Sequence, residues 1–416
     1  MSIPAGWQTT RLIEVTEKPL KMDPAATGRD HVQYVDIGAL EGPEQLLRSA
    51  SPVVAAKAPS RCRQVIRAGD TIYATVRPYL RKMAYIGREL DGEFASTGFC
   101  VLRPHAALDP KYLYHWCTAA VFEDQVLPLQ KGVSYPAVLD KEVRAALIHF
   151  PSRTEQRRIV ELVEEHLSHL DAADAALDSA RTRAQALGSA ALQQIVSEVA
   201  GDSQVVNLGE LARISSGTTP SRGNKSFWEN GLIPWITSGD LSAEDIYEAR
   251  QWVTTAALET TSLKMFPSGT LLVAMYGEGK TRGTVAELHI PATINQACAA
   301  IQLHEPAVRS WVRLVLQANY SAMRKLAVGG VQPNLNQGLI RSITIPLPEP
   351  DLRQAVLARA DVLRSGAARL QTQADTAKAR SATLRHAVLA AAFSGRLTGS
   401  SSDSEVIEAT AKGFLS

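Results

Sequence analysis

The sequence contains few cysteines and aromatic residues, and it has no long apolar run. Its four cysteines (Cys62, Cys100, Cys117 and Cys298) are scattered without a Cys-x-x-Cys pair, so we expect reduced thiols and neither a disulfide framework nor a metal site. Because no stretch of about 18 uncharged apolar residues occurs and the N-terminus lacks an apolar signal segment, we expect no membrane partner and a cytoplasmic location.

A net charge of one sign is also lacking, since 44 Lys and Arg residues face 42 Asp and Glu residues. The distribution is less even, because eight basic residues and only one acid, Asp70, lie between Lys57 and Arg88. Such a segment suits a nucleic-acid groove, but a solvated basic face would explain it equally well.

The motifs of common enzymes are absent as well: there is no Gly-x-Ser-x-Gly, no Rossmann Gly-x-Gly-x-x-Gly and no Asn-Pro-Pro-Tyr-like tetrapeptide for amino methylation. The loop "AMYGEGKTRGTV" at 274–285 ends like a Walker A motif, yet Ala274 stands where its first glycine should be. The residues after Thr281 favour a returning strand instead of the helix that a phosphate loop needs. We therefore predict a β-hairpin, with a P-loop NTPase as the weaker alternative, and no catalytic residue.

An internal repeat organises the chain. The segments "IHFPSRTEQRRIVELVEEHL" near 148 and "IPLPEPDLRQAVLARADVLR" near 345 align at an offset of 197, without a gap for more than 40 residues. Each segment is predicted to be one long helix, begun by the capping box Ser152-x-x-Glu155 or by Pro350 and ended at Gly201 or Gly395.

Apolar residues at alternating spacings of four and three predict that the two helices pack closely. In the first helix the seam is His166, Leu170, Ala173, Leu177, Ala180, Ala184, Leu187 and Ala191. In the second helix it is Leu363, Ala367, Leu370, Ala374, Ala377, Ser381, Leu384 and Val388. Two such helices, about 150 residues apart, are best explained as a spacer between two bodies.

Those two bodies repeat more loosely, as in "AGDTIYATVR" at 68 and "SGTLLVAMYG" at 268. Strand-like and helical runs alternate in both, so the predicted fold class is α+β, with two mixed α/β domains and a helical coiled-coil spacer. The predicted domains are 1–150 and 201–349, the spacer helices are 151–200 and 350–397, and residues 398–416 form a flexible tail.

Polar and basic loops at similar places in both domains are the candidate DNA contacts, because hydroxyls and cations bind phosphates and amides can read adenine. In the first domain the candidates are Arg77, Tyr79, Arg81, Lys82, Lys131, Ser134 and Tyr135. In the second they are Thr218, Thr219, Ser221, Arg222, Lys225, Tyr276, Lys280, Arg282, Gln332 and Asn334. An ordinary polar turn is the alternative explanation for each of them.

The chain resembles the specificity subunits of type I restriction–modification systems. The resemblance is carried by "FPSRTEQRRIV", "GTTPSRGNKSFWENGLIPWITSGDL", "GVSYPAV", "GVQPNLN" and "AAFSGRL", in the family's order and nearly to Leu397. The start of the second helix, "PLPEPDLRQAVL", departs from the family's usual proline-rich Glu-Gln-Arg form.

The resemblance implies two target-recognition domains, related by a pseudo-two-fold repeat, that each read one half of a split target in double-stranded DNA. It also implies antiparallel helices that set the spacer and dock two methyltransferase subunits. Those partners would carry S-adenosylmethionine, restriction subunits would add ATP-driven cleavage where present, and this nucleoid-associated chain would bind no cofactor. A free-standing DNA-binding regulator and a protein-binding scaffold are the remaining alternatives.

Overall fold

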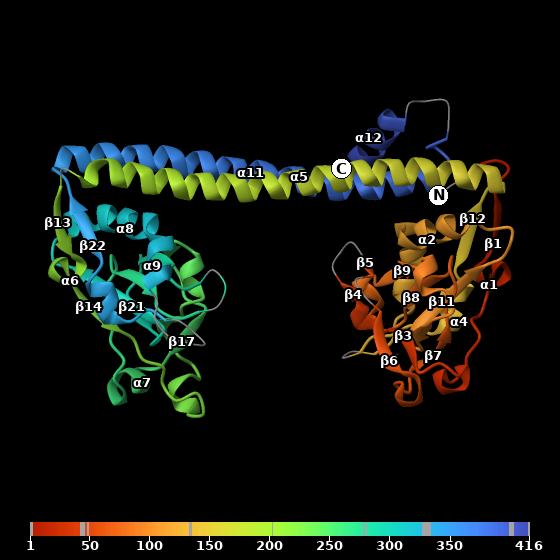
Figure 1. Cartoon of the computed structure of the whole chain (residues 1–416), viewed down its shortest axis with the longest axis horizontal. Coiled ribbons are helices and arrows are strands. Elements are labelled where there is room, and N and C mark those ends of the chain that lie inside the picture. Colours follow the sequence, from red (N-terminus) through yellow and green to blue (C-terminus); the bar gives the residue numbers. More distant parts are fainter. Residues whose placement is uncertain are drawn as a thin grey trace. The chain divides into compact units, whose positions relative to one another are not determined.

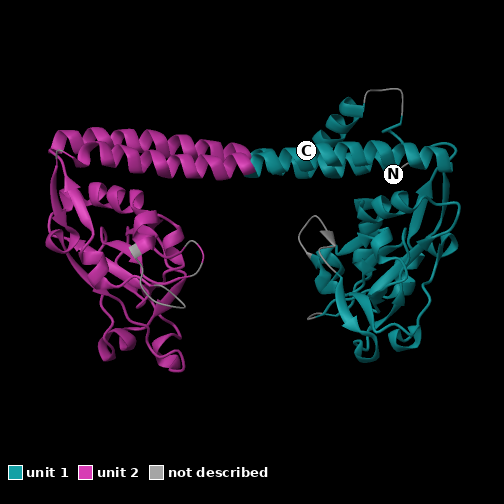
Figure 2. Ribbon diagram, viewed as in Figure 1, with its two compact units in different colours: residues 1–178, 375–416 teal, residues 179–374 magenta. Residues whose placement is uncertain are grey.

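The computed structural model of this chain describes residues 3–41, 46–47, 50–132, 135–201, 203–277, 279, 281–326, 334–398 and 403–414. These residues form two compact units, and each unit holds one α/β globule with part of two long helices (Figures 1 and 2). Unit 1 comprises residues 1–178 and 375–416, and unit 2 comprises residues 179–374. The unit boundaries therefore fall inside the helices α5 (Arg153–Ala200) and α11 (Pro350–Phe393).

Unit 1 is built around two four-stranded sheets, with strand orders β6-β3-β10-β7 and β2-β11-β8-β9, and two strand pairs, β1-β12 and β4-β5. Its strands are β1 Gln8–Arg11, β2 Thr16–Glu17, β3 His31–Val35, β4 Leu40–Glu41, β5 Leu46–Leu47, β6 Ser51–Val54, β7 Cys62–Val65, β8 Thr71–Ala74, β9 Met83–Tyr85, β10 Phe94–Ser96, β11 Phe99–Pro104 and β12 Leu147–Phe150. Its α-helices outside α5 and α11 are α1 Leu12–Val15, α2 Pro110–Thr118, α3 Ala120–Val126, α4 Asp140–Ala145 and α12 Asp403–Gly413. Its 3₁₀-helices are η1 Pro24–Thr27, η2 Ile37–Ala39, η3 Ala55–Lys57, η4 Pro78–Leu80, η5 Arg88–Leu90 and η6 Leu127–Leu129.

Unit 2 repeats this plan with a five-stranded sheet, β14-β21-β18-β19-β16, a three-stranded sheet, β17-β15-β20, and the pair β13-β22. Its strands are β13 Gln204–Asn207, β14 Ala212–Ser216, β15 Ile233–Ile236, β16 Asp245–Ile246, β17 Gln251–Val253, β18 Leu271–Ala274, β19 Val285–Leu288, β20 Thr293–Ile294, β21 Cys298–Leu303 and β22 Thr344–Leu347. Its other helices are α6 Leu208–Leu211, α7 Thr255–Thr260, α8 Arg309–Ala318, α9 Tyr320–Leu326, α10 Gln337–Arg341, η7 Lys225–Phe227, η8 Asp240–Ser242 and η9 Pro306–Val308.

The predicted hairpin at 271–288 is confirmed, because β18 pairs antiparallel with β19 and Val273 lies opposite Val285. The matching segment of unit 1 forms the same hairpin from β8 and β9. In the described residues the first element after Thr281 is strand β19 and not a helix, so the geometry of a Walker A loop is not present.

Both long helices are confirmed, and their ends carry the expected capping residues. The Ser152 hydroxyl accepts a hydrogen bond from the backbone N–H of Glu155 at 3.4 Å. Pro350 is the first residue of α11, and Gly395 adopts a left-handed φ of 71° just after its end. Within unit 1 the helices run antiparallel, because Lys378 bonds Asp178 whereas Arg385, further along α11, bonds the earlier Asp171.

The predicted seam is correct for most of α11 but wrong at three of its eight positions in α5. Ala173, Ala180 and Leu187 are exposed, Leu187 to 70%, and the seam position next to Ala173 is taken by Asp174. The carboxylate of Asp174 accepts hydrogen bonds from Ser381 and Arg385 of α11, so polar contacts hold the register there. In α11 only Leu370 departs from the prediction, with 56% exposure.

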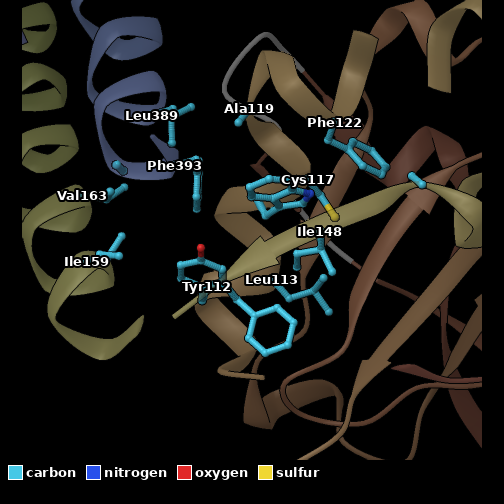
Figure 3. Close-up of a cluster of buried hydrophobic side chains, with 14 of the residues drawn as sticks. Tyr112, Leu113, Cys117, Ala119, Phe122, Ile148, Ile159, Val163, Leu389 and Phe393 are labelled. Carbon is cyan, nitrogen blue, oxygen red and sulfur yellow. The ribbon is translucent and has the colours of Figure 1, made fainter. Parts of the chain in front are cut away.

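Each globule packs its helical layer against the long helices. In unit 1, Phe393 of α11 meets Tyr112 and Trp116 of α2 edge-on, with ring centroids 5.3 and 5.1 Å apart. Figure 3 shows Leu389 of α11 and Ile159 of α5 beside the same cluster. In unit 2, Trp311 of α8 belongs to the corresponding cluster. The helices are thus part of each unit's core, so their ends are fixed to the globules.

The C-terminal segment corrects a prediction, because residues 403–413 form helix α12 where we expected a flexible tail. Ile407 and Ala411 are only 6% and 8% exposed and belong to the core cluster of unit 1. Arg380 of α11 pairs with Glu408 at 3.1 Å. The physical reason is that one apolar face of α12 buries itself on the paired helices.

Candidate nucleic-acid interface

One residue at the end of β8 joins three segments in unit 1. The N–H of Thr75 donates to the carbonyl of Gly98 at 2.9 Å, and the Thr75 carbonyl accepts from the N–H of Val138 at 2.9 Å. The hairpin tip, the β10–β11 turn and the segment before α4 therefore meet at Thr75.

The same junction occurs in unit 2 at Met275. Its N–H donates to the carbonyl of Ala297 at 2.7 Å, and its carbonyl accepts from the N–H of Leu335 at 3.0 Å. The hairpin of unit 1 closes with a hydrogen bond from the N–H of Ala74 to the carbonyl of Lys82, and that of unit 2 closes with one from Ala274 to Thr284. The tip of unit 2 is therefore two residues longer, yet its junction is the same. The repeat thus places the candidate loops of each unit side by side on one framework.

The hairpin tip of unit 1 has an unusual backbone. Arg77 and Arg81 flank η4 with φ values of 50° and 51°, and only one other non-glycine residue in the described ranges, Asn230, has a positive φ. Such conformations are unfavourable for side chains with a Cβ and gather at functional sites. Tyr79, between the two arginines, is 50% exposed. The strain therefore marks this tip as a candidate site.

Two predicted contacts of unit 1 come together at Arg77. Its N–H donates to the carbonyl of Pro136 at 2.7 Å, and its guanidinium carbon lies 5.0 Å from the ring centre of Tyr135. Tyr135 is itself 71% exposed, so the pair presents a stacked cation to solvent. Ser134 lies outside the described residues.

The other cations of unit 1 have partners within the protein. Arg81 forms an ion pair at 2.6 Å with Glu123. Burial raises the pKa of this carboxyl, and the guanidinium opposes that shift. The ammonium of Lys82 donates to the carbonyl of Ile37 at 3.0 Å. Lys131 lies 3.6 Å from Glu142 but is 80% exposed, so it keeps access to an outside anion.

In unit 2 the hairpin tip is shaped by glycines. Gly277 and Gly279 have φ values of 140° and 59°, which only glycine adopts without strain. Tyr276 is 38% exposed, and the backbone carbonyl of Arg282 accepts a hydrogen bond from Arg324 of α9 at 2.9 Å. Lys280 and Gln332 lie outside the described residues, and Asn334 is half-buried beside the junction.

The loop after β14 lies against this junction. Gly217 permits the approach, since a Cβ there would lie 2.0 Å from the carbonyl oxygen of Ile294. The N–H of Thr218 donates to that same carbonyl at 3.0 Å. The hydroxyl of Thr219 bonds Gln296, an exposed amide that the sequence did not single out. The sequence signal that could have identified Gln296 was its position just before β21.

Further along this loop, the side chain of Arg222 packs against other residues of unit 2. Its guanidinium carbon lies 3.9 Å from the ring centre of Trp228 and 4.8 Å from that of Trp235. It also donates to the amide oxygen of Gln251 at 2.8 Å. The carbonyl of Ser221 accepts from the indole N–H of Trp228 at 3.0 Å.

Lys225, which opens η7, completes the predicted set in this loop. Its ammonium lies 3.4 Å from the carboxylate of Glu229, one helical turn later, and its side chain is 83% exposed. Both groups are exposed, so the pair is weak and the lysine can exchange it for a phosphate.

One cluster in unit 2 could in principle hold a metal ion. Asp245, Glu287 and His289 bring ligand atoms within 4.8 Å of one another. Arg313 fills this space, 2.7 Å from Asp245 and 3.4 Å from Glu287. Its hydrogen bond lowers the pKa of the Asp245 carboxyl. We therefore interpret the cluster as an ion-pair network.

Among the helices of the described residues, none combines the length and the apolar character that crossing a membrane requires.

Part of the chain is similar to known DNA specificity proteins. The model of the type I restriction modification DNA specificity domain matches residues 201–359. The specificity subunit of the Escherichia coli type I restriction enzyme EcoR124I/EcoR124II is 26% identical over 167 residues. That match covers 39% of this chain and 41% of the relative, so it spans less than half of the curated subunit.

Two solved structures extend the likeness over nearly the whole chain. A chain from a study of complex assembly and conformational transition of the type I R-M system is 28% identical, with a TM-score of 0.77 and coverage of 95% of this chain and 100% of that chain. The HsdS subunit of Thermoanaerobacter tengcongensis is 27% identical, with a TM-score of 0.55 and coverage of 95% and 99%. The chain therefore contains a type I restriction modification DNA specificity domain at residues 201–359 and resembles type I specificity subunits along nearly its whole length, long helices included.

Proposed function

We propose that this chain is the DNA sequence-recognition subunit of a type I restriction–modification complex and reads a bipartite target with one half-site per recognition domain. The observation that carries the proposal is the duplicated junction at Thr75 and Met275, which presents a polar, partly aromatic loop cluster in each unit. Phosphate contacts from the exposed lysines would fix the register, and side chains at the hairpin tips would read base edges.

We further propose that methyltransferase subunits dock on the long helices and supply catalysis with S-adenosylmethionine. Exposed apolar side chains on the helices of unit 2 support this role, because Leu187 and Val362 are 70% and 69% exposed. Val362 also lines a hollow of about 400 Å³ with Ile195 and Leu363. Where the host also makes restriction subunits, they would join the same complex.

The test is a genome-wide map of methylated adenines in the host, with and without the gene. A bipartite motif that disappears on deletion and returns with a plasmid copy supports the proposal. For a host whose methyltransferase is expressed, an unchanged set of methylated sites contradicts it.

The near-neutral net charge of +2 adds an expectation about affinity. Because non-specific DNA binding depends on released counterions, the isolated chain should bind its target much more weakly than the assembled complex at equal salt. If fluorescence anisotropy gave the isolated chain and the assembled complex equal affinity, the partner subunits would contribute nothing to DNA binding.

A further inference from the structure

Arg77 differs from every other described cation in the candidate set. The others have polar partners within the protein: Arg81 with Glu123, Lys82 with Ile37, Lys131 with Glu142, Arg222 with Gln251 and Lys225 with Glu229. Arg282, which is half-buried, is also engaged in an interaction. Within the part of the chain that the structure describes, the side chain of Arg77 stacks on the Tyr135 ring and makes no hydrogen bond or ion pair.

This arrangement leaves the hydrogen-bonding edge of the guanidinium unused. A guanidinium carries five N–H donors in a planar fork, and stacking on an aromatic ring occupies its face and none of its donors. Arg77 and Tyr135 are both exposed, so the N–H donors of the guanidinium face solvent while the Tyr135 ring supports its plane. A free, planar fork fits a ligand that offers two adjacent acceptors.

The backbone conformation at Arg77 indicates that its side chain serves recognition. Arg77 adopts φ 50° and ψ 57° directly before Pro78, a left-handed conformation that is unfavourable for arginine and natural for glycine. The hydrogen bond from its N–H to Pro136 holds it there. An arginine where glycine would fit with less strain indicates a side chain that serves binding.

We propose that Arg77 reads a guanine through its O6 and N7 atoms in the major groove, within the half-site bound by unit 1. The inference rests on the proposed function and adds the identity of one base pair. Guanine presents two acceptors at the spacing of the arginine fork, whereas adenine offers one acceptor and one donor there. Tyr135 orients the fork by stacking. A good bidentate contact discriminates against the wrong base by about 10-fold to 100-fold.

The experiment uses the full-length chain co-expressed with the methyltransferase subunits of its host. The purified complexes methylate a library of duplex DNA with randomised positions, and sequencing of the methylated molecules gives the preference at every base pair. The variants are Arg77→Lys, which keeps charge without the fork, and Arg77→Gly, which keeps the left-handed backbone. Arg88→Ala, an exposed arginine of the same domain outside the candidate set, is the matched control.

We expect the wild-type motif to contain a G·C pair whose preference falls by about 10-fold to 100-fold in Arg77→Gly. The preference should fall by less in Arg77→Lys, because an ammonium can still donate to guanine but lacks the planar fork. All other positions, including the second half-site, should keep their preferences, and Arg88→Ala should match the wild type. Arg77→Gly should unfold at a temperature equal to or above that of the wild type, which a merely structural arginine would not allow.

Three results would overturn the inference. If both variants keep the wild-type motif, Arg77 reads no base, although the proposed function stands. If the relaxed position is not a G·C pair, or if all positions of the half-site relax together, Arg77 does not read guanine. If the wild-type complex yields no bipartite motif, the proposed function fails, and the assignment of Arg77 fails with it.

Discussion

Gln156 gives the sharpest test of how unit 1 is held to helix α5. Its side chain is fully buried and makes three hydrogen bonds. The amide oxygen accepts from the N–H of Asp109 at 2.7 Å, and the amide nitrogen donates to the carbonyls of Ala107 and Pro151 at 3.0 Å each. Asp109 in turn caps helix α2. One glutamine therefore joins the first turn of α5 to the start of α2.

The change Gln156→Ala removes all three bonds and leaves their partners buried. At about 1 kcal/mol net for each bond, unit 1 should lose about 3 kcal/mol of its free energy of unfolding. Hydrogen–deuterium exchange of the most protected amides in unit 1 should then quicken about 100-fold, because about 1.4 kcal/mol corresponds to a factor of ten. Unit 2 should keep its wild-type protection.

The repeat provides a matched control, because Arg353 of α11 lies at the equivalent position, 197 residues later. Arg353 is half-exposed, so Arg353→Ala should change the stability of unit 2 by only about 0.5 kcal/mol. A loss below about 1 kcal/mol in Gln156→Ala, or an equal loss in Arg353→Ala, would refute the assignment of three effective hydrogen bonds.

Further predictions follow from single contacts. In Arg81→Ala the pKa of Glu123, already raised by burial, rises further, so thermal denaturation should show a loss of stability at pH 7. This loss narrows as the pH falls through the raised pKa of Glu123, above the ordinary carboxyl value of 4.5; a loss independent of pH contradicts this. Gly217→Ala should lower the melting temperature of unit 2 by several degrees or more because its Cβ would overlap a backbone carbonyl, whereas Gly223→Ala, with open space around it, should not; equal effects would refute the packing argument. Ile407→Asp should release α12 and expose residues 403–413 to limited proteolysis, and unchanged resistance would count against the docked helix.

The large-scale plan was predictable because it depends on signals that the sequence carries twice. Pro350 and Ser152 begin the two long helices as expected, and the β-branched Val285 returns the hairpin as a strand. The seam of α5 was misplaced because an apolar pattern was assumed throughout. A half-buried Asp174 that accepts hydrogen bonds from Ser381 and Arg385 cannot be recognised before the partner helix is placed.

Helix α12 was missed because its serine-rich approach was interpreted as part of a flexible tail. The spacing of Ile407 and Ala411 is typical of one buried helical face, and the partner surface on α11 that stabilises it is formed only in the folded unit.

The candidate site was predictable as a set of loops, whereas the state of each side chain was not. The polar partners of Arg81 and Arg222 are Glu123 and Gln251, which are distant in sequence, so no local signal distinguishes these arginines from the open Arg77. The left-handed backbone of Arg77 also depends on the carbonyl of Pro136, a tertiary contact. Of the candidates, Ser134, Lys280 and Gln332 lie outside the described residues, and DNA contact remains a prediction for all of them.

The matched hydrogen bonds at Thr75 and Met275 have a consequence for how such proteins acquire new targets. The bonds that the two junctions share join backbone atoms, although the Thr75 hydroxyl adds a bond to the carbonyl of Gly98 in unit 1. The other side chains and even the length of each hairpin tip can therefore change while the shared attachment stays intact. The two tips already differ by two residues on one common base. The hairpin tip of one unit should therefore be replaceable by that of the other. Exchanging tips in this way would be a direct route to new specificity, by engineering or by evolution.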